Sequence, residues 1–171
     1  MKPEVRLGDP GDLDGAARVW ARATAKRDGK AEIPPLEEAK DVVRDSLREE
    51  RSTLVVAADE GVVIGFAAAE PTASSRVAEV RFVGVDPDYW GYGVGGLVIA
   101  RMADELASAG FHSAQLLVYA DNDAARRLYE RMGWTWDEQE PSIHPRTGKP
   151  EVRYNLALDS RVSRSQSHTD L

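Results

Sequence analysis

Cysteine is absent from this chain of 171 residues. Disulfide bonds, thiolate metal ligands and a cysteine nucleophile are therefore excluded. The three histidines, His112, His144 and His168, share no metal-ligand spacing, so we predict no metal site. No apolar run approaches the length that spans a membrane, and the first residues lack the apolar stretch of a signal peptide. We expect a cytoplasmic protein with no membrane partner.

Basic residues are outnumbered by acidic ones, with 22 Lys and Arg against 29 Asp and Glu. The formal net charge is −7 at pH 7, whereas proteins that bind nucleic acid need clustered lysine and arginine. We therefore predict no nucleic acid partner. An acidic surface can attract a cationic substrate such as an amine, although acidic surfaces more often serve solubility.

The pattern of apolar residues predicts a single mixed α/β domain over residues 1–159 and a polar, flexible tail over 160–171. Strands are expected at 5–7, 54–58, 62–69, 77–85, 114–119, from 134, and at 152–158. Helices are expected at 13–27, 36–47, 97–107 and 124–132. This order lacks the strict βα alternation of doubly wound nucleotide-binding folds.

A cluster of glycines follows the strand expected at 77–85, and an apolar-periodic helix is expected from Leu97. Glycine weakens a helix start, so the cluster needs a reason. Bare N–H groups at the positive end of a helix can hold an anion, and no Asp or Glu lies between Gly91 and Ala100. The segment predicts a phosphate site, with a tight, closely packed turn as the alternative.

The same glycines admit another interpretation. Gly91, Gly93 and Gly96 satisfy G-x-G-x-x-G, and Asp121 stands roughly where a ribose-binding acid could lie. A dinucleotide fold would place the first glycine directly after the strand, but residues 86–90 intervene here. A dinucleotide-binding protein is thus a weaker alternative.

Two motifs in this chain resemble those of the GNAT N-acetyltransferase superfamily. The acyl-CoA signature Arg/Gln-x-x-Gly-x-Gly/Ala is matched at Gly93 and Gly95, while Trp90 stands at the position of Arg or Gln. The second motif, Asn-x-x-Ala-x-x-Leu-Tyr-x-x-x-Gly-Phe, is matched at Asn122, Ala125, Leu128, Tyr129 and Gly133, with Trp134 in place of Phe. The resemblance covers about Val5 to Leu158.

The resemblance implies a GNAT-like fold, which is a central twisted mixed sheet of about seven strands with helices on both faces. Its fourth and fifth strands splay apart to admit the thioester arm of acetyl-CoA, the implied co-substrate. Asn122 is a candidate N-cap of the helix expected at 124–132. By this resemblance its amide also contacts the pantetheine arm, and Tyr129 lies near the sulfur. The pantetheine pairs with Val83, Gly84 and Val85, and the pyrophosphate binds at Gly91, Tyr92, Gly93, Val94, Gly95 and Gly96.

Acetyl transfer to an amine needs a neutral amine, a donor for the oxyanion and a hydrogen bond or proton for the leaving thiolate. Tyr129 is the candidate donor to the thiolate, or otherwise a core aromatic. Glu79 is the candidate base, or otherwise the partner of Arg81 in a surface ion pair. The resemblance implies that the backbone N–H of Val85 holds the oxyanion.

We therefore predict an N-acetyltransferase that moves an acetyl group to a primary amine of a small molecule, protein or peptide by direct attack in a ternary complex. Because Trp90 departs from the signature, a non-catalytic acyl-CoA sensor with the same fold is the alternative. A homodimer is kept as an option, since dimers are common in such families.

Overall fold

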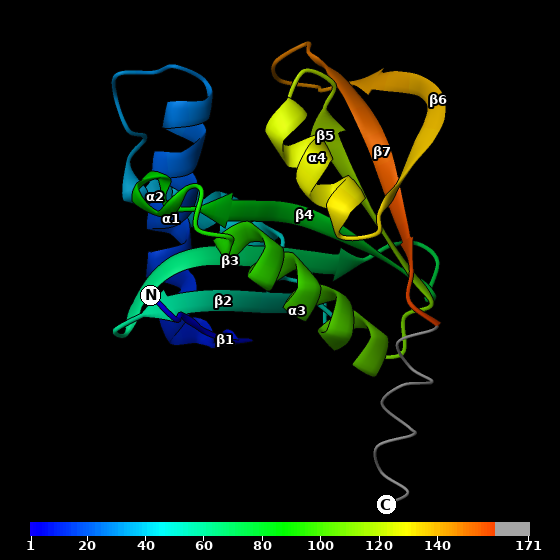
Figure 1. Cartoon of the computed structure of the whole chain (residues 1–171), viewed down its shortest axis with the longest axis horizontal. Coiled ribbons are helices and arrows are strands. Elements are labelled where there is room, and N and C mark those ends of the chain that lie inside the picture. Colours follow the sequence, from blue (N-terminus) through cyan, green and yellow to red (C-terminus); the bar gives the residue numbers. More distant parts are fainter. Residues whose placement is uncertain (160–171) are drawn as a thin grey trace, which may run out of the picture. The chain divides into compact units, whose positions relative to one another are not determined.

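The computed structural model describes residues 1–159, which divide into two compact units (Figure 1). Unit 1 comprises Met1–Glu70 and Arg81–Met102, and unit 2 comprises Pro71–Val80 and the chain from Ala103 on. The tail predicted at 160–171, with His168, lies outside the described residues. The single domain over residues 1–159 stays a prediction.

Seven strands form one mixed sheet in the order β1-β2-β3-β4-β5-β7-β6, which confirms the predicted fold class and the predicted order of elements. The strands are β1 (Glu4–Leu7), β2 (Thr53–Asp59), β3 (Val62–Pro71), β4 (Val77–Val85), β5 (Ser113–Tyr119), β6 (Thr135–Ile143) and β7 (Pro150–Ala157). The helices are α1 (Leu13–Arg27), α2 (Leu36–Asp45), α3 (Val94–Ser108) and α4 (Asp123–Arg131), with short 3₁₀ turns η1 (Pro10–Asp12) and η2 (Pro87–Tyr89).

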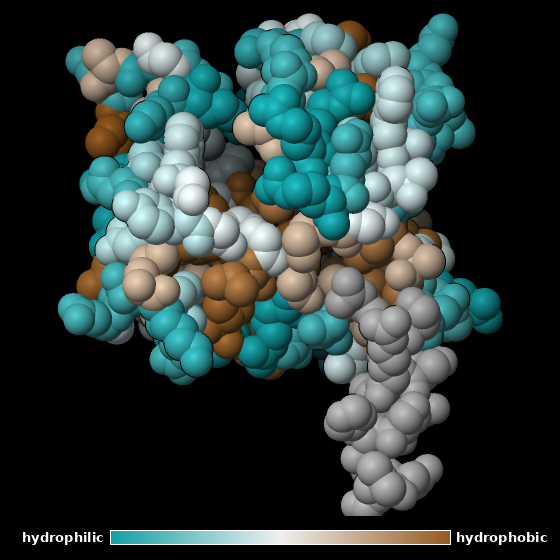
Figure 2. All heavy atoms as spheres, in the orientation of Figure 1, coloured by the Kyte–Doolittle hydropathy of each residue, from teal (hydrophilic) through white to brown (hydrophobic). Residues whose placement is uncertain are grey.

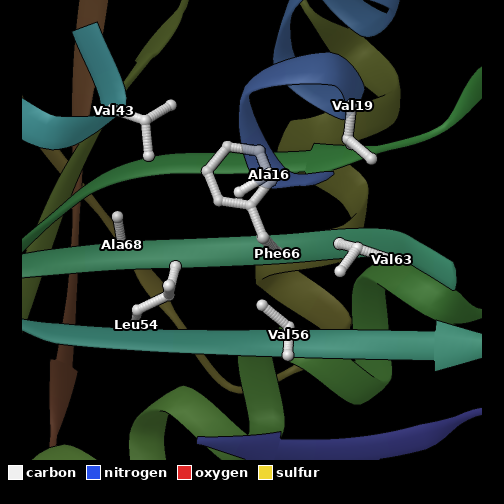
Figure 3. Close-up of a cluster of buried hydrophobic side chains, with 8 residues drawn as sticks. All are labelled: Ala16, Val19, Val43, Leu54, Val56, Val63, Phe66 and Ala68. Atoms are coloured by element: carbon white, nitrogen blue, oxygen red, sulfur yellow. The ribbon is translucent and has the colours of Figure 1, made fainter. Parts of the chain in front are cut away.

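Helices cover both faces of the sheet in unit 1. On one face α1 and α2 pack on β2 and β3, where Phe66 is central to the buried cluster drawn in Figure 3. On the other face the first half of α3 packs so closely that a Cβ added to Gly65 would lie 2.8 Å from a methyl group of Val94. The buried runs of β2 and β3 follow from this two-sided cover, because neither face meets water.

In unit 2 the first half of β4 pairs in parallel with β5, from Val77 opposite Ser113 to Val80 opposite Leu116. Strand β7 pairs antiparallel with both β5 and β6. Its pairing with β6 shifts register between Asp137 and Ser142, so β6 is irregular in its middle.

Helix α4 is anchored on β7 by a short hydrogen-bonded chain. The Arg126 guanidinium donates to the Tyr154 hydroxyl over 3.1 Å, and that hydroxyl donates to the Glu130 carboxylate over 2.7 Å. The Tyr154 ring is fully buried, with its centroid 6.0 Å from that of Tyr129. The face of α4 that carries Tyr129 is therefore fixed against β7.

The entry to α1 depends on an ion pair between β1 and η1. Arg6 donates two hydrogen bonds to the buried Asp12 carboxylate, over 2.7 and 3.0 Å. Asp12 also accepts the backbone N–H of Asp9, whose own carboxylate accepts the N–H of Gly11 in a capping box. The hydrogen bonds from Arg6 are the main reason why the pKa of Asp12 is lowered.

We predict that Asp12→Asn lowers the free energy of unfolding by about 1 kcal/mol at pH 7, as expected for a partly exposed charged hydrogen bond. The folded pKa lies below the unfolded value, so this stabilisation is complete above the unfolded pKa and is lost as the pH falls through the folded one. Urea denaturation from pH 7 to pH 2.5 checks this. A difference that stays constant below about pH 4 would contradict it.

Candidate functional site

The glycine-rich segment of unit 1 begins with a tightly held turn. The Asp86 carboxylate accepts the backbone N–H of Asp88 and so caps η2. Gly91 and Gly93 then have φ angles of +88° and +82°, and beyond the adjoining residues no atom of residues 1–159 lies within 4 Å of a Cβ added to either. Glycine is therefore required at both positions by the left-handed backbone and not by lack of space.

Helix α3 starts at Val94, three residues before the predicted start at Leu97. Gly95 and Gly96 thus lie in its first turn, and the expectation that the glycines all precede the helix is wrong. The Leu97 N–H donates to the Gly93 carbonyl over 3.2 Å, which is the first bond of the helix. The N–H groups of residues 94–96 have no acceptor one turn earlier in the helix, because such a turn does not exist.

These N–H groups stand at the positive end of the helix, where an anion is stabilised. The surface over the start of α3 is pale rather than hydrophilic teal in Figure 2. Glycines and aromatic residues form this segment, and Tyr92 is 68% exposed. From Gly91 to Ala100 the chain has no carboxylate that would repel a phosphate.

The end of β4 contains the residues predicted to pair with the pantetheine. Gly84 is buried, and an added Cβ would lie 2.8 Å from the Phe66 ring, so core packing accounts for this glycine. The Val85 carbonyl accepts the indole N–H of Trp90 over 2.8 Å. The next N–H, that of Asp86, donates to the Ile64 carbonyl on β3 over 2.8 Å.

Tyr129 in unit 2 is buried between the rings of Trp134 and Tyr154. Burial raises the pKa of Tyr129 to about 12. Among residues 1–159 no group hydrogen-bonds to its hydroxyl, so this hydroxyl is available to a ligand. Tyr129 is thus part of the core, as the alternative interpretation held, and still has a polar group that the core does not use.

Asn122 is the N-cap of α4, and its side-chain oxygen accepts the Ala125 N–H over 3.2 Å. This confirms the capping role that its position allows. The amide nitrogen of the side chain is not used by the cap and can donate elsewhere.

Glu79 lies on the first half of β4, opposite Gln115 of β5. Its alternative role, an ion pair with Arg81, is not formed, because Arg81 pairs with Glu70. Within the described chain the Glu79 carboxylate has no hydrogen bond or ion pair. Glu79 is half buried. Because its carboxylate has no partner among the described residues, it is available as a base.

The predicted site residues fall into two sets. Val83–Val85 and Gly91–Gly96 belong to unit 1, where a single turn links them. Glu79, Asn122 and Tyr129 belong to unit 2. Within residues 1–159, no group of three or more His, Asp or Glu side chains could hold a metal ion, and no helix is both long and apolar enough to cross a membrane.

The sequence did not predict that two residues of α1 contact the glycine-rich segment. Arg22 of α1 pairs with Asp86 and Asp88, and the Lys26 ammonium lies 5.0 Å from the centre of the Trp90 ring. Arg22 and Lys26 are four residues apart, so the sequence places them on one face of a helix. The sequence does not indicate, however, which segment of the chain packs against this face of α1.

The fold is that of known acetyltransferases. A solved acetyltransferase from Salmonella typhimurium, whose structure contains its cofactor acetyl-CoA, matches with a TM-score of 0.72 at 21% identity. The match covers 93% of this chain and 95% of that one. The described sheet, with its antiparallel β1–β2, β2–β3 and β5–β7 pairs, gives no support to the doubly wound dinucleotide-binding alternative.

The sequence model of the Acetyltransferase (GNAT) family matches residues 19–134, so this chain belongs to the GNAT family, as its two motifs indicated. A mycothiol acetyltransferase of Amycolatopsis mediterranei is 36% identical over an alignment of 144 residues that covers 78% of this chain. Another, from Streptomyces griseus, is 39% identical over 79 residues, which are 46% of this chain. The chain spans 46% and 26% of the lengths of these two relatives.

We predict that Gly91→Ala weakens binding of CoA about tenfold, because a Cβ at positive φ forces the backbone N–H groups to turn. Gly61→Ala is the matched control, since Gly61 has a φ of +80° and equally open surroundings in the β2–β3 turn. Both variants should lose about 1 kcal/mol of stability. Titration calorimetry with CoA separates them, and equal affinities in the two variants would contradict a phosphate site at Gly91.

Proposed function

We propose that this chain is an acetyl-CoA-dependent N-acetyltransferase that transfers the acetyl group to a primary amine of a small molecule, protein or peptide. The observation that carries this proposal is the row of N–H groups at the start of α3, behind left-handed Gly91 and Gly93, for which residues 1–159 supply no acceptor. Membership of the GNAT family and the names of the curated relatives support it.

In this proposal the pyrophosphate of CoA lies on the N–H groups of residues 91–96. The thioester arm runs along the backbone of Val83–Val85, and the Asn122 amide donates to the pantetheine. The Val85 carbonyl already accepts the indole N–H of Trp90. The backbone N–H of Val85 therefore binds the thioester.

The chemistry is a direct displacement. The neutral amine nitrogen attacks the thioester carbon, a C–N bond forms, and the Val85 N–H stabilises the oxyanion. The C–S bond then breaks and releases CoA as a thiolate. Glu79 takes the proton of the amine, directly or through water, and Tyr129 donates a hydrogen bond to the thiolate.

The high pKa of Tyr129 defines its part more closely. With a pKa of about 12, Tyr129 stays protonated through the neutral and mildly alkaline range. A thiol has a pKa of about 8.5, so complete proton transfer from Tyr129 to the thiolate is unfavourable by several pKa units. Tyr129 therefore stabilises the thiolate by a hydrogen bond, and the proton reaches the sulfur from water.

Release of free thiol from acetyl-CoA across a panel of amines tests the proposal. The panel combines small primary amines, peptides with a free N-terminus, lysine peptides and the acceptor of mycothiol acetyltransferases. Amine-dependent thiol release is the expected result. Tight CoA binding without turnover on any acceptor would favour the acyl-CoA sensor instead, and preference for NAD over CoA would overturn both.

The location and assembly of the chain stay predictions of its sequence: cytoplasmic, without a nucleic acid or membrane partner, with a homodimer as an option. Light scattering of the purified protein measures the assembly.

Glu79→Gln is expected to lower kcat/KM by at least about tenfold near neutral pH, because the amide cannot accept the amine proton. Glu70→Gln is the control. It breaks the pair with Arg81 and affects stability but removes no proposed base. If Glu79→Gln keeps the wild-type kcat/KM from pH 6 to pH 10, as Glu70→Gln should, then Glu79 is not the base.

Tyr129→Phe is expected to lower kcat by about tenfold or more while the affinity for CoA changes little, since the lost hydrogen bond forms with the leaving thiolate. A group with a pKa of about 12 loses its proton only near and above that pH. The kcat of the wild type should therefore show no descending limb from this residue between pH 8 and pH 10. A limb in that range that disappears in Tyr129→Phe would contradict this role.

A further inference from the structure

The segment between β4 and the glycines is held by the last turns of α1. Arg22 reaches Asp86 over 3.4 Å and Asp88 over 3.0 Å. One turn later, the Lys26 ammonium lies over the face of Trp90, with 5.0 Å to the ring centre. A cation over an exposed indole contributes about 0.5–1 kcal/mol. This contact favours the observed orientation of the Trp90 side chain, although the residue is 43% exposed.

In that orientation Trp90 fixes the last peptide of β4. The peptide group that joins Val85 to Asp86 is planar, so its carbonyl and its N–H move together. The carbonyl accepts the indole N–H of Trp90 over 2.8 Å, and the N–H donates to Ile64 over 2.8 Å. Two hydrogen bonds on opposite sides thus determine the rotation of this peptide plane.

This peptide sets the direction of the neighbouring N–H. In an extended strand the N–H and the carbonyl of one residue point to the same edge, and those of the next residue point to the other edge. Asp86 uses the edge that faces Ile64 of β3, so the Val85 N–H and carbonyl point to the opposite edge. The indole of Trp90 therefore binds at the same edge as the Val85 N–H.

We propose that Trp90 is a positioning residue for acetyl transfer: its indole N–H holds the Val85 carbonyl and thereby aims the Val85 N–H at the oxyanion. This inference rests on the proposed function. An oxyanion donor is effective because it is oriented before the reaction, and loss of a whole donor costs about 10²–10³ in kcat. A donor that is present but loosely aimed costs less, about tenfold.

Trp90→Phe isolates the indole N–H, because phenylalanine keeps an aromatic face for Lys26. We expect kcat with acetyl-CoA to fall about tenfold while the dissociation constant of CoA, which has no acetyl carbonyl, stays within about twofold. Lys26→Met is the matched variant, since it removes the cation but keeps the indole N–H, and its kcat should fall by less than about twofold. An unchanged kcat in Trp90→Phe, or equal losses of kcat and CoA affinity, would overturn the proposal.

Nuclear magnetic resonance of the wild type tests the hydrogen bond without any activity. The indole proton of Trp90, assigned by its loss in Trp90→Phe, should exchange with solvent at least about tenfold more slowly than that of a free indole. In Trp90→Phe the amide resonances of Val85 and Asp86 should shift. Exchange as fast as in a free indole overturns the proposal. If the wild type turns over no amine, the proposed function fails, and this measurement still decides whether Trp90 holds Val85.

Discussion

The contact between Phe66 and Gly84 connects the core of unit 1 to its candidate site. Phe66 is fully buried on β3, within the cluster that α1 and α2 cover. Its ring occupies the space that a side chain at position 84 would need. The backbone of β4 therefore lies close against the core just before the turn that leads to the glycines. The position of the Val85 N–H is then a consequence of core packing, because the residue beside it cannot move inward.

Much of this arrangement was predictable from the sequence, because apolar periodicity and turn residues are local signals. The seven strands, the four helices and their order follow from such patterns, as does the cap at Asn122. The start of α3 was not predictable in the same way. Glycine has low helix propensity, so Gly95 and Gly96 argued for a start at Leu97, but the helix begins at Val94. Propensity is a weak preference that tertiary packing can override, and the Val94 side chain is buried against Gly65.

Contacts between segments that are distant in the sequence were also not predictable. The pattern of β4 placed Glu79 and Arg81 on one side, which suggested an ion pair, yet Arg81 binds Glu70 on the adjoining stretch of β3. Trp90 stood out only as a departure from a motif. Its hydrogen bond to Val85 and the cation over its ring depend on how α1 meets the turn, which no local pattern encodes. The motifs thus identified which segments matter, and packing decided what each side chain does there.

The irregular β6 has a consequence for the whole chain. It is the last strand in the order of the sheet, so one of its edges has no neighbouring strand in the described chain. An open edge can recruit a strand of another molecule and start aggregation. Here the strand carries Asp137, Glu138, Glu140 and Pro141, and its register shifts in the same stretch. Negative charge, a missing N–H and a broken register make this edge a poor template, so the open margin of the sheet is protected against the growth of intermolecular β-structure.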